Sequence, residues 1–158
     1  MSNTRPVTYS PEEVDITCVF AGEGKSIVDF EEVQPELTDD VFSHTQSASG
    51  FTTRIKNAGK LGVIRISVPL ASTTNRILTE MFEHSEDNYH RSDSFVDVTI
   101  KGKPHEGVPA MKAAYEMPFG TVKKPASPTF AKDPDNVEWE IEGHFKTFKS
   151  EGFGYIDD

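Results

Sequence analysis

The chain has 158 residues, of which 35% are hydrophobic, and its formal net charge is −10. This length suits one domain with a buried core and polar segments around it. The acidic balance argues against a general nucleic-acid binder and against binding to anionic membranes, because both need clustered basic side chains. A single cysteine, Cys18, excludes an intrachain disulfide. We expect neither a signal peptide nor a membrane span, since no stretch approaches about 20 apolar residues.

The N-terminal third predicts an arm followed by strands. Residues 1–13 are polar and predict a flexible arm. From Val14 to Phe20 apolar and polar residues alternate, which predicts a first strand. Residues 21–26 predict a turn, and residues 27–37 predict a second strand, in which Pro35 favours a sheet edge or a bulge.

The middle of the chain predicts a loop, a hairpin and a helix. Residues 38–50 are small and polar and predict a loop. Residues 51–56 and 61–70 predict two strands, joined into a hairpin by residues 57–60, with Arg65 facing away from the core. The segment "ASTTN" then offers residues that cap a helix. The predicted core residues of the second strand and of the helix are Ile64, Ile66, Ile77, Leu78, Met81 and Phe82.

The C-terminal half predicts further strands and a long loop. Residues 95–100 predict a strand turned by residues 101–103, and residues 110–117 fit either a strand or a short helix. The proline-rich residues 121–136 predict a loop, and residues 150–158 a tail. The predicted fold class is mainly β, an antiparallel β-sandwich or barrel with one flanking α-helix, in a single β-rich domain over residues 14–149.

One strand near the C-terminus, "VEWEIEGHF", carries a row of like charges. Trp139 lies on its apolar face, which we expect in the core, while Glu138, Glu140 and Glu142 lie on the other face, about 7 Å apart. Calcium needs oxygens that converge from several directions, and side chains on one strand face splay along a line. We therefore expect a repelling wall that faces water, moderated near one end by lysines. These lysines are Lys146 and Lys149.

Other residues that suggest chemistry have simpler interpretations. The segment "GEGKS" at residues 22–26 is similar to the end of a phosphate-binding loop, but a strand-like segment follows it instead of a helix. Cys18 is in phase with buried residues, which favours packing over a nucleophilic role. Four histidine and aspartate residues recur at every third position, which is not the spacing of zinc ligands on a helix, so they predict a solvated stretch. These residues are His84, Asp87, His90 and Asp93. The aromatic residues predicted in the core beside Trp139 are Phe20, Phe51, Phe95 and Phe145.

The segment "FTTRIKNAGKLGVIRISVPLASTTNRILTEMF" resembles the tail tube (inner tube) proteins of contractile-tailed bacteriophages. The order of its parts carries the resemblance: a polar loop ending at Gly50, a strand, a short turn and a second strand. That strand runs through Leu70 into an S-x-x-N turn at Ser72 and Asn75, and a helix follows. The first strands and the tryptophan strand near the C-terminus are also similar, and none of these motifs is catalytic.

This resemblance implies a structural virion protein with no enzymatic activity, cofactor or metal. Six copies would form a ring, and rings would stack into a hollow tube inside a contracting sheath, the conduit for DNA ejection. The implied partners are the chain itself, the sheath, baseplate, tape measure and tail terminator proteins, and the implied location is the virion tail, after assembly in the host cytoplasm. DNA would pass through without specific binding.

Within such a tube two sets of residues are predicted to act. Glu138, Glu140 and Glu142 would face the bore and offer DNA no counterion-release gain. The loop over residues 38–50 would order between stacked rings. Its predicted contact residues are Asp39, Asp40, Phe42, His44 and Gly50.

Three other functions are alternatives. The same architecture serves the inner tube of bacterial contractile injection systems, including type VI secretion, and the sequence separates the two kinds of tube poorly. A monomeric β-sandwich binding module, for instance for carbohydrate, would need an exposed aromatic platform that the sequence does not show. An enzyme has the least support, because no local group of catalytic residues occurs.

Overall fold

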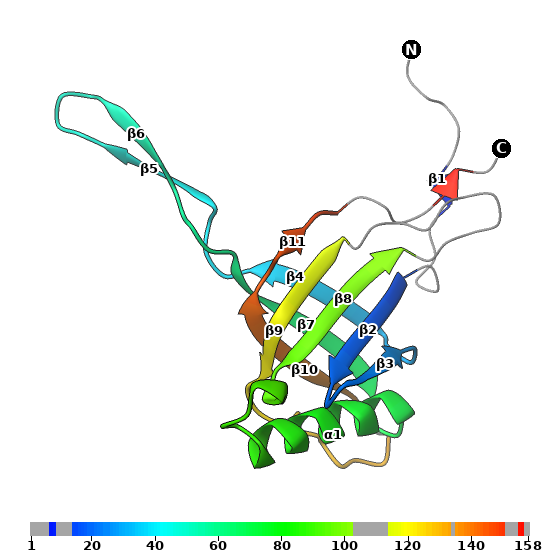
Figure 1. The fold of residues 1–158 in the computed structure, drawn as a ribbon. Helices are drawn as coiled ribbons and strands as arrows, with labels where there is room; N and C mark the ends of the chain where they lie inside the picture. Colours follow the sequence, from blue (N-terminus) through cyan, green and yellow to red (C-terminus); the bar gives the residue numbers. More distant parts are fainter. Residues whose placement is uncertain (1–6, 9–13, 103–113, 134, 151–154, 157–158) are drawn as a thin grey trace.

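A computed structural model of the chain describes residues 7–8, 14–102, 114–133, 135–150 and 155–156 (Figure 1). Its centre is an eight-stranded sheet in the order β3-β2-β8-β9-β10-β7-β4, with β11 paired to β9, and every pairing is antiparallel. The strands are β2 (Val14–Phe20), β3 (Glu23–Ile27), β4 (Glu32–Leu37), β7 (Leu61–Pro69), β8 (Val96–Gly102), β9 (Tyr115–Val122), β10 (Asn136–His144) and β11 (Thr147–Phe148).

The sheet turns over on itself into two layers (Figure 1). β3, β2, β8 and β9 form one layer, and β10, β7 and β4 form the other. β9 connects them, because its start pairs with β8 and β11 while Thr121 and Val122 pair with β10. The predicted β-sandwich with one flanking helix is therefore confirmed.

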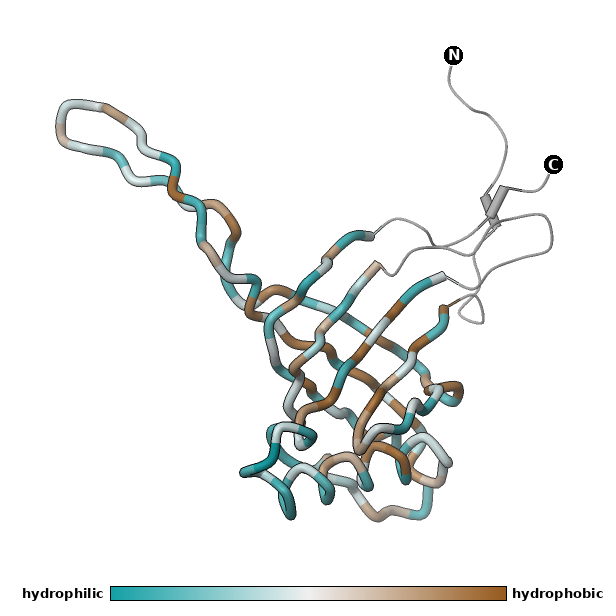
Figure 2. Tube along the Cα trace, in the orientation of Figure 1, coloured by the Kyte–Doolittle hydropathy of each residue, from teal (hydrophilic) through white to brown (hydrophobic). Residues whose placement is uncertain are grey.

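The core lies between the layers because apolar and polar residues alternate along the strands. Figure 2 shows apolar positions interleaved with hydrophilic ones on the strands of the body. Ile64 and Ile66 of β7 are fully buried, as predicted, and Trp139 of β10 is buried opposite Ile66. Other buried side chains include Ile16, Cys18, Val68, Val96, Val98, Ile100, Met117, Val137, Ile141 and Phe145.

Helix α1 (Thr73–Asp87) covers one end of the sandwich (Figure 1). Ser72 is its N-cap, and the Ser72 Oγ accepts a hydrogen bond of 3.1 Å from the backbone N–H of Asn75. The predicted apolar stripe faces the core, with two residues fully buried and two packed against it at partial exposure. These residues are Leu78 and Met81, then Ile77 and Phe82. The predicted helix and its cap are confirmed.

The predicted second strand over residues 27–37 is in fact two strands. A tight turn at Ala21 and Gly22, both with positive φ, lets β3 begin at Glu23, inside the predicted turn. Residues 28–31 then cross between the layers, and β4 follows at the opposite end of the sheet order. Pro35 therefore lies on an edge strand, as predicted, where its missing N–H breaks no ladder.

Two predictions about the middle of the chain are wrong: residues 38–50 do not form only a loop, and the strands over residues 51–56 and 61–70 do not pair into a hairpin. β5 (Phe42–Gln46) lies within the predicted loop and pairs with β6 (Thr52–Lys56). β6 does not pair with β7, because β4 and β10 occupy both edges of β7. The turn lies instead at the tip, where Ser47 N–H donates to the Phe51 carbonyl over 2.9 Å.

Smaller corrections concern the C-terminal half. β8 continues to Gly102, through part of the predicted turn, and Thr121 and Val122 end β9 rather than begin the proline-rich loop. Residues 115–117 are strand, whereas residues 103–113 lie outside the described part of the chain. A short 3-10 helix, η2 (Ser92–Ser94), precedes β8.

The two ends of the chain pair with each other at two positions. β1 (Val7–Thr8) runs antiparallel to β12 (Tyr155–Ile156). The other residues of the predicted flexible segment at the N-terminus, residues 1–6 and 9–13, lie outside the described residues. The same holds for residues 151–154 and 157–158 of the predicted tail. Within the described ranges, no helix has both the length and the apolar character to cross a membrane.

Replacing Trp139 with alanine tests the packing of the helix on the sheet. The indole is buried, and its Nε1–H donates a hydrogen bond of 2.9 Å to Asn75 Oδ1 on α1. We expect Trp139→Ala to lower the free energy of unfolding by about 3–5 kcal/mol, as a core truncation does. Urea denaturation followed by circular dichroism measures this change.

A matched aromatic control is Phe130→Ala, because the Phe130 side chain is 85% exposed. Its effect should stay within about 0.5 kcal/mol. Equal effects of the two substitutions would show that Trp139 does not lie in the core.

Candidate functional site

The outward side of the layer formed by β10, β7 and β4 is rich in carboxylates. Register pairs Glu138, Glu140 and Glu142 of β10 with Ser67, Arg65 and Val63 of β7, and all six side chains point away from the buried face. On the other flank, β4 adds Glu32, Gln34 and Glu36. We call this surface the acidic face; it consists of Glu32, Gln34, Glu36, Val63, Arg65, Ser67, Glu138, Glu140 and Glu142.

Arg65 lies at the centre of the acidic face and binds carboxylates on both flanks. Its Nε donates to Glu140 Oε1 over 3.2 Å, and its Nη1 donates to the carboxylate of Glu36. The hydrogen bond to Glu36, followed by the one to Glu140, raises the pKa of the Arg65 guanidinium. Arg65 therefore ties the three strands together across their outward surface.

A second cation lies at the margin of the acidic face. The Lys123 Nζ lies 2.6 Å from Glu142 Oε2, and the hydrogen bond to this carboxylate raises the pKa of Lys123. The expectation of an unpaired row of glutamates is thus wrong for Glu140 and Glu142. The repulsion among these glutamates is reduced by Arg65 and Lys123 rather than by Lys146 and Lys149. β7 places Arg65 directly opposite Glu140, and Lys123 pairs with Glu142.

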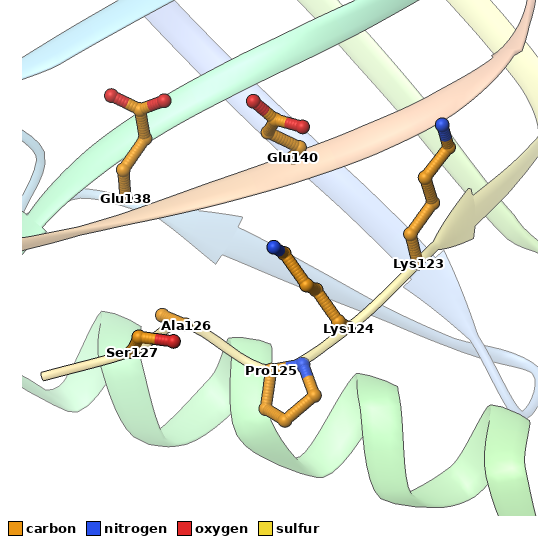
Figure 3. Close-up of a pocket in the computed structure, with 7 residues that line it drawn as sticks. All are labelled: Lys123, Lys124, Pro125, Ala126, Ser127, Glu138 and Glu140. Carbon is orange, nitrogen blue, oxygen red and sulfur yellow. The ribbon is translucent and has the colours of Figure 1, made fainter.

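A cleft of about 570 Å³ adjoins the acidic face (Figure 3). Figure 3 shows the carboxylates of Glu138 and Glu140 along β10, with Lys123 and Lys124 reaching from the adjoining segment. The full lining is Lys123, Lys124, Pro125, Ala126, Ser127, Glu138 and Glu140. Charged side chains of both signs line the cleft, whereas small-molecule sites are mostly apolar. The cleft therefore gives little support to a binding-module function.

The second candidate surface is the hairpin formed by β5 and β6, which projects away from the sandwich (Figure 1). We call residues 41–57 the arm; its last backbone bond joins Asn57 N–H to the Val41 carbonyl over 2.8 Å. Every residue from His44 to the end of the arm is exposed. The arm packs against no other part of the described chain. Because an isolated two-stranded hairpin is only marginally stable in water, we expect the arm to be stabilised by contact with another molecule.

The residues predicted to mediate inter-ring contacts all lie on or next to the arm. Phe42 and His44 are on β5, Gly50 is in the turn with φ of +90°, and Asp39 and Asp40 precede the arm. The Asp40 carbonyl accepts a hydrogen bond from the Asn57 side chain. The structure thus groups these residues on one projecting element, although as a hairpin rather than a loop.

Two aromatic residues predicted in the core are exposed. Phe51 is at the tip of the arm and is 77% exposed, and Phe95 lies just before β8. Phe95 packs edge-to-face on Phe119, with 5.7 Å between ring centroids, and Phe119 is 68% exposed. Because Val96 and Val98 are buried and side chains alternate along a strand, Phe95 has to lie on the outward face. By contrast, Phe20 and Phe145 are buried as predicted.

Residues weighed for chemistry have structural contacts. Cys18 is fully buried, and burial, followed by the charge of Asp97, raises the pKa of its thiol to about 12. His84 Nε2 lies 3.1 Å from the Asp93 carbonyl, and its Nδ1 lies 3.3 Å from Asn88 Nδ2. Among the described residues, His, Cys, Asp and Glu side chains form no cluster of three that would hold a metal.

Comparison with known proteins finds the same architecture in contractile particles. A chain in the cryo-EM structure of the anti-feeding prophage (AFP) tube-terminating cap superposes with a TM-score of 0.58 at 9% identity, covering 90% of this chain and 90% of that chain. A chain in the sheath–tube complex of PVC, an extracellular contractile injection system, gives 0.54 at 13% identity, covering 88% of each. A chain in the AFP baseplate gives 0.55 at 10% identity, covering 92% and 94%.

This chain has the fold of components of contractile injection systems. No family model matches its sequence, and no curated protein gives a significant match. The likeness therefore lies in the arrangement of strands and helix, and it covers about nine tenths of this chain.

Replacing Arg65 with methionine tests the charge arrangement of the acidic face. The substitution leaves Glu36 and Glu140 without their cation on a surface with three further glutamates, so repulsion rises. We expect a lower urea midpoint at about 0.1 M salt and a smaller loss at about 1 M, because the screening length falls from about 10 Å to about 3 Å.

The control is Arg76→Met, which removes the exposed pair with Glu80 on α1, 3.3 Å long. Such i,i+4 surface pairs contribute little. If both substitutions give the same small shift at both salt concentrations, the Arg65 network does not stabilise the sheet.

Proposed function

We propose that this protein is the structural subunit of the hollow inner tube of a contractile particle, assembled as stacked six-membered rings. The observation that carries the proposal is the shared fold with chains of a tube cap and a sheath–tube complex, over about nine tenths of each chain. The order of motifs in residues 51–82 supports the same function independently. The protein acts as neither an enzyme nor a cofactor carrier.

The two ends of the sheet supply the contacts for a ring. β3 and β4 end the strand order, and each has one edge without a partner in the described chain. Edge strands present free N–H and C=O groups that pair with another chain. A ring joins such surfaces heterologously, one edge of each copy against a different surface of the next.

The acidic face is the surface that we assign to the bore. It combines five glutamates with Arg65, and Lys123 lies at its margin. In a six-membered ring, Glu138 and Glu140 would recur once per copy and form negative circles along the channel. A wall of this sign does not retain DNA, because it releases no counterions on contact. The same wall would let an acidic protein cargo pass.

The partners of the tube are then the subunit itself, the sheath outside it, and the baseplate, tape measure and terminator proteins at its ends. The tube is part of the finished particle and is assembled in the cytoplasm of the host cell. Two kinds of particle fit: a phage tail and a bacterial injection system. The structures described above come from injection systems, which favours the second kind. Neighbouring capsid genes would instead favour a phage.

The assembly state of the purified protein tests the proposal. We expect rings of six copies or long tubes in negative-stain images, and a mass of six subunits or more by light scattering during size-exclusion chromatography. A reconstruction of the tube should place Glu138 on its inner wall. A monomer at all concentrations would refute the tube function, and an outward Glu138 would refute only the bore assignment.

Deleting the arm tests its part in stacking. β5 and β6 pair only with each other, so replacing residues 42–56 with a short turn should leave the sandwich folded. We expect this variant to form rings but no tubes, with an unchanged circular dichroism spectrum apart from the lost hairpin. Tubes of normal length from the deletion variant would contradict a stacking role of the arm.

A further inference from the structure

The arm differs in charge from the rest of the chain. Residues 41–57 contain no Asp or Glu, although the whole chain has 26 of them. The arm carries Arg54 and Lys56, and Lys60 lies three residues after its end. Both strands of the arm are basic or neutral, while the net charge of the chain is −10.

The basic residues of the arm share one of its faces. Cross-strand register pairs Phe42 with Lys56 and His44 with Arg54, so these four side chains lie on the same side of the hairpin. The Arg54 guanidinium lies 4.9 Å from the centre of the Phe42 ring. This side, which we call the basic side of the arm, therefore offers cations next to an exposed aromatic ring.

Helix α1 has the opposite charge at the other end of the sandwich (Figure 1). Glu80, Glu83 and Asp87 follow one another at helical spacing, with Glu86 beside them, and all four are exposed. Arg76 pairs with Glu80, whereas Glu83, Glu86 and Asp87 form no ion pair within the described residues.

These carboxylates stand where the helix itself disfavours them. The C-terminal end of a helix carries partial negative charge, so cations stabilise it and carboxylates destabilise it. The last turn of α1 contains Glu86 and Asp87 with His84, and the first turn contains no acidic residue. The acidic residues of α1 therefore lie at the end where they destabilise the helix. Cations supplied by another molecule would reduce this unfavourable interaction.

Topology places the arm at one end of β7 and the start of α1 at the other. β7 begins beside the arm at Leu61 and ends at Pro69, just before α1. Copies stacked in the same orientation therefore bring the arm of one to the helix of the next, a heterologous contact that repeats without closing. Each strand of the arm spans about 15 Å, enough to reach beyond its own body.

We propose that the basic side of the arm docks on the acidic C-terminal half of α1 in the next copy of this chain. The proposal rests on the stacked-ring function and names the surface that the arm binds. Arg54 and Lys56 meet Glu83, Glu86 and Asp87, and Phe42 adds apolar contact. The segment after β9, which runs past α1, carries Lys123, Lys124, Lys132, Asp133 and Asp135. Lys123 pairs with Glu142, so the remaining charges balance.

Charge reversal and its compensation test the contact. Arg54→Glu with Lys56→Glu, or Glu83→Lys with Asp87→Lys, should each give rings without tubes, since like charges then face each other. The combination of all four substitutions should restore tubes, because the charges are again complementary. A matched control, Lys101→Glu with Lys149→Glu, has the same change in net charge as the arm reversal and should form tubes like the unchanged protein. Sedimentation and negative-stain images measure the fraction in tubes.

The possible results separate the two levels of the proposal. If the unchanged protein forms neither rings nor tubes, the tube function falls, and the docking falls with it. If it forms tubes and the arm reversal does too, the docking is wrong while the tube function stands. If the four-residue combination assembles no better than either pair, the arm contacts another surface and the docking is overturned.

Disulfide trapping provides a readout that does not depend on tube formation. The single native thiol, Cys18, is fully buried, so introduced surface cysteines react selectively. Thr52→Cys on the basic side of the arm and Glu83→Cys on α1 should together give a ladder of crosslinked chains under mild oxidation. The control pairs Thr52→Cys with Thr121→Cys, on β9 instead of α1, and should give no ladder. A ladder from the control alone would overturn the docking.

Discussion

The pairing of β7 with β10 along nine residues each is the constraint on which both surfaces of the molecule depend. It fixes the register that puts Ile66 against Trp139 inside and Arg65 against Glu140 outside. A slip of one residue would exchange these faces and put charge into the core. Burial of the apolar side therefore determines the geometry of the acidic face, which needs no further interaction to hold its carboxylates in a row.

Closure of the sandwich depends on how near the chain comes to itself at two glycines. At Gly62 of β7, a Cβ atom would run into the Glu36 carbonyl oxygen and the Phe145 ring. At Gly143 of β10, it would lie 2.8 Å from the Phe119 carbonyl oxygen. The first contact occurs where β7 meets β4, and the second occurs where β10 meets β9, so a side chain at either glycine would push these neighbouring segments apart. The absence of a side chain, rather than an attraction, sets the distance between them.

The sequence predicted elements whose pattern is local and failed where pairing is not local. Alternation located the core of β7 and β10, and the cap at Ser72 located the helix. The arm was missed because none of its side chains is buried, so β5 shows no apolar phase. The partner of β6, in turn, depends on which edges β7 has free. The glutamates were predicted on one face, but Arg65 became their partner only when three strands were in register.

In the proposed tube, the distribution of charge would keep free subunits apart and let them adhere in one direction. A net charge of −10 makes free copies repel at long range, which opposes random association. Screening limits this repulsion to about 8–10 Å, so a local contact of opposite sign overrides it at short range. In the docking proposed above, the acid-free arm supplies such a contact at one end only. Copies can then approach productively in a single orientation, and orientation is what distinguishes a tube from an aggregate.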